Sequence, residues 1–254
     1  MSAFSQESKE LPECSAPEYL GTTIEFPCSY NPQRTECLLV AIPPKGTRFG
    51  KYCFTVLSQF GFRRSGTQLY RPYCPGCQKC VSVRLRVHEF KLDRTFNRCL
   101  KKNSDLQLTI VKPANTPEYV KLLIKYLSNR HPDDEEPPTE ETFQKYYVDS
   151  VGETEFFEYR DRYGKLVIVS IVDVFHDGLS AVYTFYDPDE LKRSPGTYGI
   201  LRQIEETKKR GLPYLYLGFW IEDVPNMSYK TRFQPLEFFE LEEWKEFQDK
   251  PRIY

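Results

Sequence analysis

The sequence predicts an α/β (α+β) protein built around a mixed, mostly antiparallel sheet. Residues 154–186 contain three apolar runs separated by two short polar turns, which is typical of antiparallel strands. Apolar residues at helical spacing occur before these strands at 116–129 and after them at 198–210. A further apolar run at 213–219 indicates a buried strand directly after the second helix.

The first hundred residues predict separate elements. We expect a helix at 48–60, a strand at 80–87 and a basic helix at 93–103. In the strand, valine and leucine alternate with serine and arginine. This alternation predicts a half-buried strand with a basic outer face.

From residue 106 the expected order is strand, helix, helix, three antiparallel strands, helix, strand, helix, strand. This order resembles the N-acetyltransferase (GNAT) fold, which carries acyl transfer to amines, although a fold alone does not define a function. We therefore expect three segments: a flexible tail at 1–15, a cysteine-rich basic N-terminal domain at 16–105, and a GNAT-like aminoacyltransferase domain at 106–254.

Composition and charge limit the kinds of protein that this chain can be. The chain has 254 residues, a formal net charge of −1 and 40% hydrophobic residues, as expected of a folded globular protein. Residues 1–11 are polar and no long apolar run follows, so we expect a cytoplasmic protein without a membrane partner. Eleven Lys or Arg but only two acidic residues lie between residues 63 and 102, which favours an anionic partner for this region.

Eight cysteines in such a chain are expected to be thiols or metal ligands rather than a disulfide framework. Cys74, Cys77 and Cys80 are separated by two residues each, so their thiols could bind one ion. Cys28 is the candidate fourth ligand and Cys37 the reserve. Zinc or an iron–sulfur cluster would fit these thiols, and a group of thiols without metal is the alternative.

Three arginines lie near a tight turn. Arg63 and Arg64 stand between Gly61 and Gly66, and Arg71 follows shortly after. Forked guanidinium groups could bind a carboxylate or a phosphate here. A solvated basic loop is the alternative.

A glycine-containing segment at 193–199 precedes the helix at 198–210. It partly matches the GNAT pattern Arg/Gln-x-x-Gly-x-Gly/Ala, whose backbone N–H groups bind pyrophosphate at a helix N-terminus. Arg193 and Gly196 fit, but Tyr198 occupies the last position. We expect its ring to crowd a coenzyme A pyrophosphate, which argues against acetyl-CoA as the donor.

Together, several segments resemble the bacterial branch of the arginyl-tRNA–protein transferases, the aspartate/glutamate leucyltransferases. The matching stretches are 28–30, 61–66, 69–83, 179–188, 193–200 and 216–233. The resemblance implies a leucyl- or arginyl-tRNA donor, acceptor proteins with N-terminal Asp or Glu, and degradation of the tagged protein by the N-end rule. The short chain favours leucine.

Such a reaction needs no cofactor, because the aminoacyl ester is already activated and an amine attacks it. We expect Asp187 to act as general base and Tyr183 to donate to the oxyanion or the leaving ribose oxygen. The candidates for binding the acidic acceptor residue are Arg63, Arg64, Arg71 and Arg84. The candidates for binding tRNA are Arg86, Arg193, Trp220, Lys230 and Arg232.

Three other functions stay open from the sequence. Arginine could be the donor amino acid in place of leucine. The chain could instead be an acetyl-CoA-dependent N-acetyltransferase of the GNAT fold. It could also be a non-catalytic zinc module that binds nucleic acid, although residues 106–254 would then have no purpose.

Overall fold

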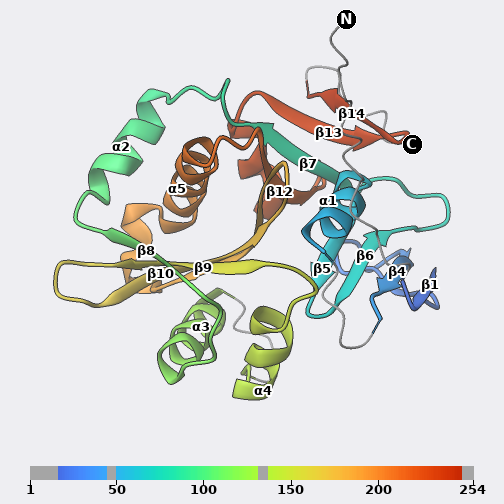
Figure 1. The fold of residues 1–254 in the computed structure, drawn as a ribbon, viewed down its shortest axis with the longest axis horizontal. Helices are drawn as coiled ribbons and strands as arrows, with labels where there is room; N and C mark the ends of the chain where they lie inside the picture. Colours follow the sequence, from blue (N-terminus) through green and yellow to red (C-terminus); the bar gives the residue numbers. More distant parts are fainter. Residues whose placement is uncertain (1–16, 45–49, 131–136, 248–254) are drawn as a thin grey trace, which may run out of the picture.

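The computed structural model describes residues 17–44, 50–130 and 137–247. Its centre is an eight-stranded sheet in the order β14-β13-β7-β12-β11-β10-β9-β8 (Figure 1). The strands of this sheet are β7 (Val81–Arg86), β8 (Gln107–Val111), β9 (Thr154–Arg160), β10 (Leu166–Val174), β11 (Gly178–Tyr186), β12 (Tyr214–Trp220), β13 (Leu236–Glu240) and β14 (Glu243–Glu246).

Strands β8 to β11 form an antiparallel meander, as the turn pattern predicts. All nine residues of β10 are buried, because helices cover both faces of the sheet there. The next pair, β11 and β12, is parallel. A parallel pair needs a crossover connection, and helix α5 (Pro195–Lys209) supplies it.

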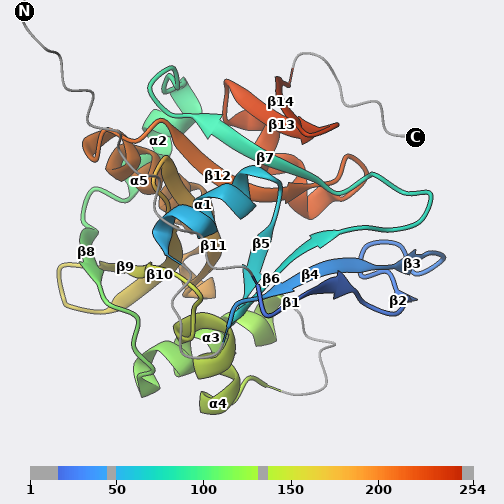
Figure 2. The ribbon, with the colours of Figure 1, turned by 45° about the vertical axis from the view of Figure 1, so that its right-hand side comes forward.

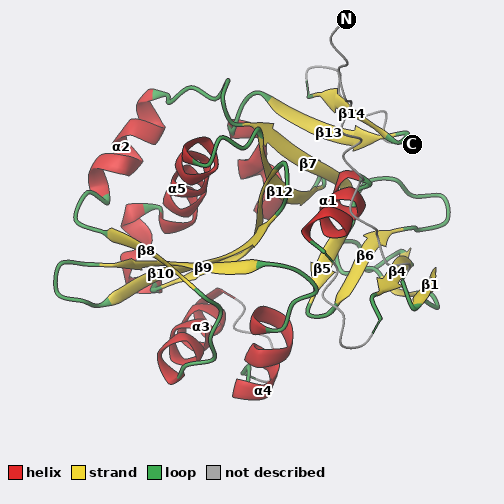
Figure 3. Ribbon diagram, viewed as in Figure 1, coloured by secondary structure: helices red, strands yellow, loops and turns green. Residues whose placement is uncertain are grey.

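Two groups of helices lie on opposite faces of the sheet (Figure 3). Helices α2 (Arg94–Lys102) and α5 pack on one face, with Phe96, Ile204 and Leu215 in the main apolar core. Helix α3 (Pro117–Arg130) and the short α4 (Glu140–Phe143), continued by the π-helical η1 (Gln144–Val148), cover the other face. Both faces are therefore shielded from water near β9, β10 and β11.

A smaller N-terminal sheet lies beside the large one, and Figure 2 shows it at the right-hand side. Its order is β1-β4-β6-β5, and β2 and β3 form a separate pair. The bounds are β1 (Tyr19–Thr22), β2 (Phe26–Pro27), β3 (Thr35–Glu36), β4 (Leu38–Ile42), β5 (Arg63–Ser65) and β6 (Gln68–Pro72). Helix α1 (Lys51–Gln59) joins the two sheets, since Phe54 packs edge-on against Phe175, directly after β10, at 4.8 Å between ring centroids.

The predicted fold class is confirmed, and the predicted helices and strands occur within a few residues of their expected bounds. The boundary expected at residue 105 does not separate two folded units, because β7 lies inside the large sheet between β12 and β13. For the same reason β7 is not half-buried: Ser82 and Arg84, predicted to face solvent, are 9% and 7% exposed. The expected tail at 1–15 lies outside the described residues.

None of the described helices has the length and apolar character required to cross a membrane. Two short 3₁₀ segments complete the fold. They are η2 (Pro188–Arg193), which leads into α5, and η3 (Pro225–Arg232), which follows β12.

Candidate functional site

The candidate site is a cavity where β11 and β12 separate. The two strands pair only from Gly178↔Tyr214 to Ser180↔Tyr216. Beyond this point lies a cavity of about 710 Å³, which we call the β11–β12 cavity. A crevice between parallel strands, close to the start of the crossover helix, is a common ligand site in mixed sheets.

One side of the β11–β12 cavity is apolar and another is cationic. The apolar lining includes Ala181, Val182, Leu191, Ile200, Leu217 and Met227. The cationic lining consists of Arg63, Arg130 and Lys230. No Asp or Glu is among the described residues that line this cavity.

Arg63 reaches the cavity from β5. Its Nη2 donates to the carbonyl oxygens of Ala181 at 3.0 Å and Val182 at 3.3 Å. These carbonyls belong to β11 beyond its last pair with β12, so Arg63 fills part of the gap between the strands. Its guanidinium carbon lies 5.8 Å from the ring centroid of Phe219.

Lys230 approaches from η3 and is 6% exposed. Its Nζ donates a hydrogen bond to the carbonyl of Phe219. Burial, together with the charge of Arg63, lowers the pKa of Lys230 to about 7. Within the described part of the chain, neither Lys230 nor Arg63 has a carboxylate within 4.0 Å, so the Arg63 guanidinium and the titratable amine of Lys230 line the cavity without an anion.

Aromatic side chains form the wall next to α3. Tyr126 packs on Tyr186 at 4.8 Å and Tyr183 packs on Tyr147 at 5.3 Å between ring centroids. Tyr183 also hydrogen-bonds Tyr147, whose pKa burial raises to about 12. The structure thus places Tyr183, the predicted hydroxyl donor, in the cavity lining.

The N-terminus of α5 also faces the cavity. Ser194, Pro195, Gly196 and Thr197 line it, and the N-cap residue Ser194 makes no side-chain capping bond. The first N–H groups of a helix have no partner inside the helix and favour an anion. A phosphate group could bind here.

Tyr198 does not obstruct this helix end. Its side chain is 4% exposed and packs edge-on against Tyr159 in the main core, at 5.5 Å. The expectation that its ring would crowd a pyrophosphate was therefore incorrect, because the first turn of α5 points residue 198 inward. Tyr198 supplies no argument against a coenzyme.

The structure does not bring Asp187 to the cavity. Its carboxylate binds Lys125 at 2.6 Å and Lys165 at 2.7 Å, and it accepts from the backbone of Asp189. These partners lower its pKa despite the opposing effect of burial. Asp187 thus links the end of β11 to Lys125 of α3 and to Lys165, which directly precedes β10.

Two of the four arginines proposed for the acceptor are structural. Arg64 is 6% exposed and binds both oxygens of Asp173 at 3.0 Å, because it points to the opposite face of β5 from Arg63. Arg84 binds Glu237 at 2.7 Å and lies 3.7 Å from the ring centroid of Tyr214. Neither Arg64 nor Arg84 lines the β11–β12 cavity.

Of the residues proposed for tRNA binding, some line the cavity and others do not. Lys230 lines the cavity, but Trp220 is 6% exposed and packs against Phe247. Arg86 pairs with three glutamates, Arg193 pairs with Asp105 and Glu190, and Arg232 lies over the ring of Phe96. Trp220 is therefore not available for stacking, and neither Arg86 nor Arg193 is an unneutralised cation.

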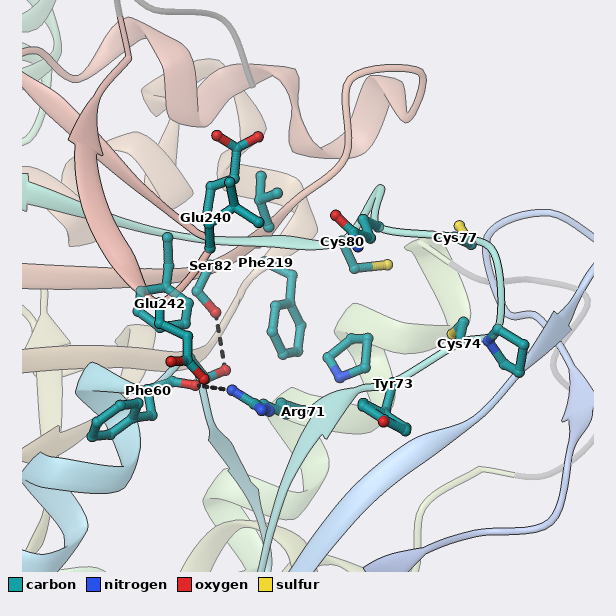
Figure 4. A pocket seen from close by; sticks show the side chains of 17 residues that line it. Phe60, Arg71, Tyr73, Cys74, Cys77, Cys80, Ser82, Phe219, Glu240 and Glu242 are labelled. Atoms are coloured by element: carbon teal, nitrogen blue, oxygen red, sulfur yellow. Dashed lines mark hydrogen bonds between the residues drawn. The ribbon is translucent and has the colours of Figure 1, made fainter. Parts of the chain in front are cut away.

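Arg71 lines a second cavity of about 580 Å³, shown in Figure 4, which we call the β7–β13 cavity. Cys74, Cys77 and Cys80 lie on one side of it. Burial and the neighbouring thiols, including that of Cys28, raise the pKa of Cys80 to about 12.

No group of three or more His, Cys, Asp or Glu in the described residues is arranged to hold a metal ion. A metal bound by Cys28, Cys74, Cys77 and Cys80 therefore stays a prediction. Six described cysteines are free thiols. Cys53 departs from the expectation that all cysteines are thiols or metal ligands, since it is disulfide-bonded.

Several cavity residues escaped the sequence analysis. Tyr30, Tyr126, Arg130 and Thr184 line the β11–β12 cavity and come from three distant segments, with Tyr126 and Arg130 together on α3. Arg130 donates to Asn226 at 2.9 Å, which connects the end of α3 to η3. Only the positions of these segments in the fold bring the residues together, and no local pattern marks them.

Two family models match the chain. The model described as "Arginine-tRNA-protein transferase, N terminus" matches residues 26–98, and "Arginine-tRNA-protein transferase, C terminus" matches residues 118–240. An aspartate/glutamate leucyltransferase of Saccharophagus degradans is 40% identical over 90% of this chain and 96% of its own length. One from Marinobacter nauticus is 43% identical over 86% of this chain and 92% of its own length.

Among solved structures, FemX is similar with a TM-score of 0.44, at 9% identity over 81% of this chain and 80% of that chain. L-PGS from Bacillus licheniformis is similar with a TM-score of 0.43, at 11% identity over 68% of this chain and 51% of that chain.

Proposed function

Because this chain belongs to the arginine-tRNA-protein transferase family, we propose that it transfers leucine from Leu-tRNA to the N-terminal amine of proteins that begin with Asp or Glu. The tagged proteins would then be degraded by the N-end rule, and the reaction belongs in the cytoplasm, where charged tRNA occurs. The observation that carries the proposal is the pair of cations, Arg63 and Lys230, facing a cavity without a carboxylate.

The acceptor's first side chain is the anion that this pair lacks. A carboxylate placed between Arg63 and Lys230 would favour the protonated form of Lys230 and form charge-assisted hydrogen bonds with both groups. An uncharged isostere such as Asn would leave the cations without an anion, so the site selects by charge as well as by shape. Asp187, Arg64 and Arg84 take no part in this recognition.

The composition of the cavity favours leucine over arginine as the donor residue. The aliphatic lining suits a leucyl side chain. An arginyl side chain would find no Asp or Glu among the described lining residues, and the guanidinium groups of Arg63 and Arg130 would repel it. The donor's amino acid therefore occupies the apolar side, and the acceptor's acidic residue occupies the cationic side.

The tRNA end approaches over α5. The phosphate on the 5′ side of the terminal adenosine can bind the free N–H groups at the start of this helix. Helix α2 packs beside that end, because Lys102 donates to the carbonyl of Lys192 at 3.0 Å and Asn103 to that of Arg193 at 2.9 Å. The exposed basic residues of α2 thus lie beside the cavity mouth, where they attract the tRNA backbone.

The reaction joins the acceptor nitrogen to the ester carbonyl carbon and breaks the bond from that carbon to the ribose oxygen. The N-terminal amine has a pKa of about 8, so part of it is neutral at cytoplasmic pH. The proton that the amine loses ends on the leaving ribose oxygen. Tyr183 lines the cavity, and its hydroxyl is the group we assign to donate to the oxyanion or that oxygen.

The experiment that tests this function measures transfer of labelled leucine and labelled arginine from tRNA to peptides that begin with Asp, Glu, Asn or Ala. We expect leucine transfer to the Asp and Glu peptides only. Arginine transfer at an equal rate would contradict the donor assignment. Equal transfer to the Asn peptide would contradict the role of the two cations.

A further inference from the structure

We propose that the β7–β13 cavity binds the second and following residues of the acceptor polypeptide in an extended conformation. This inference rests on the proposed function and adds a second binding subsite to it. It assigns a ligand to a cavity that lies outside the reaction centre. The ligand is a peptide segment that is uncharged or basic.

The cavity lies where two strands of the large sheet separate. Strands β7 and β13 pair only from Leu236↔Leu85 to Phe238↔Val83. Before Val83 they diverge, and the cavity occupies the gap (Figure 4). A widening gap between two strands suits an extended chain, which can add its backbone to strand edges.

The two cavities adjoin each other. Phe219 lines the β7–β13 cavity with its side chain, while its carbonyl binds Lys230 of the β11–β12 cavity. Tyr70 packs on Phe219 at 5.9 Å, and Tyr30, which lines the β11–β12 cavity, is 43% exposed. Phe219 is thus common to both cavities. An acceptor whose first residue lies between Arg63 and Lys230 would pass Phe219 to reach the second cavity.

The charges at the β7–β13 cavity favour a peptide over tRNA. Glu240 and Glu242 lie on the β13–β14 hairpin at its edge. Lys245 neutralises Glu240 at 3.1 Å, whereas Glu242 has no ion pair within the described ranges. At this edge Glu242 would repel a phosphate and attract a Lys or Arg of the acceptor, while the cationic Arg71 lies elsewhere in the lining.

Donors for the peptide backbone are also present. The Nη1 of Arg71 donates to the carbonyl of Phe60 at 3.0 Å, and the guanidinium lies over the ring of Phe62 at 5.3 Å. Its remaining N–H groups have no carboxylate partner in the described part of the chain, so they can donate to acceptor carbonyls. Apolar side chains of Phe60, Phe219 and Phe239 provide the remaining contact surface.

The test measures the affinity of fluorescently labelled Asp peptides for the full chain without tRNA. We expect a hexapeptide to bind about fivefold or more tighter than the dipeptide Asp-Ala amide, because only the longer peptide reaches the second cavity. Among hexapeptides, Lys at positions 2–4 should improve binding by about 2–5-fold over Glu, as an exposed ion pair does.

The variant Glu242→Lys should reverse this charge preference. The matched control is Glu141→Lys on α4, which makes the same charge change on an exposed residue far from the cavity and should keep the preference. Equal affinities of the dipeptide and the hexapeptide, or a preference unaffected by Glu242→Lys, would overturn the subsite. Leucine transfer, measured in parallel, tests the proposed function separately. If no transfer occurs, the peptide affinities still show whether the second subsite exists.

Discussion

A β-carbon built on Gly218 would lie 1.4 Å from the Nη1 of Arg63. The φ angle of Gly218 is 78°, a conformation that favours glycine. Arg63 therefore reaches the carbonyls of β11 only because residue 218 has no side chain. The position of one of the two cavity cations depends on this glycine.

Replacing Gly218 by alanine should displace Arg63 and impair recognition of acidic acceptors. We expect kcat/KM for Asp peptides to fall at least about tenfold, because the guanidinium must leave its place between the strands. Gly164→Ala is the matched control, since Gly164 has a φ of 82° but open space around it. That control should lose about 1–2 kcal/mol of stability and keep its activity. Equal activity losses in both variants would show that backbone strain is responsible.

Lys230→Met should stabilise the protein at low pH. The folded-state pKa of Lys230 is lowered to about 7, whereas an unfolded lysine titrates near 10.4. Below pH 7 the buried lysine is charged in both states and its burial is unfavourable. Between pH 7 and about 10 only the unfolded state holds the proton, so wild-type stability rises with pH relative to the variant, by at most about 1.4 kcal/mol per unit. The measurement is the free energy of urea unfolding at pH 6, 7.5 and 9.

The exposed Lys101→Met on α2 should show no such trend and serves as the control. The free energies of unfolding of wild type and Lys230→Met could instead differ by the same amount at all three pH values. That result would contradict the unpaired burial of the ammonium group.

Asp187→Asn should lower stability and leave catalysis largely intact. The carboxylate holds Lys125 and Lys165, so its loss should destabilise by about 1–3 kcal/mol. Because the folded-state pKa of Asp187 is lowered, this stability is present above the unfolded pKa and is lost as the pH falls through the folded value. Thermal unfolding and kcat/KM at 25 °C provide the comparison. A hundredfold loss of kcat with an unchanged melting temperature would restore Asp187 as the base.

Helix α2 should contribute to the salt dependence of tRNA binding. Its exposed surface carries Arg94, Arg98, Lys101 and Lys102, and no carboxylate within 4.0 Å neutralises them among the described residues. Arg98→Gln should weaken tRNA binding and reduce the slope of log K against log salt by roughly 0.7–0.9. Lys121→Gln, on α3 at the opposite face of the sheet, is the control and should leave the slope unchanged. An identical slope in wild type and Arg98→Gln would exclude α2 from the interface.

The order of elements was predictable because local patterns determine most of it. The strand at 154–160 and the helix at 116–129 show their periodicity directly in the sequence. The central position of β7 was not predictable, since its alternating pattern describes an edge strand or a half-exposed strand equally well. Its basic face is buried because Glu237 of β13 and the rings of Tyr214 and Trp244 cover Arg84.

The site was only partly predictable for a similar reason. Arg63 and Arg64 are adjacent and equally suited to bind a carboxylate, yet the strand directs them to opposite faces. Only the tertiary structure shows that Arg64 forms an ion pair with Asp173 and that Arg63 lines the cavity. The lowered pKa of Lys230 likewise arises from the burial of its side chain on η3, which no local sequence signal reveals.

The most direct test of the account compares leucine transfer to two peptides that differ only in an N-terminal Asp or Asn. For the wild type we expect kcat/KM to favour Asp by about 10–100-fold, the effect of one or two charge-assisted hydrogen bonds. In Lys230→Met this ratio should approach one, chiefly through a higher KM for the Asp peptide. If Lys230→Met discriminates between Asp and Asn as strongly as the wild type does, the cation pair in the β11–β12 cavity does not recognise the acceptor.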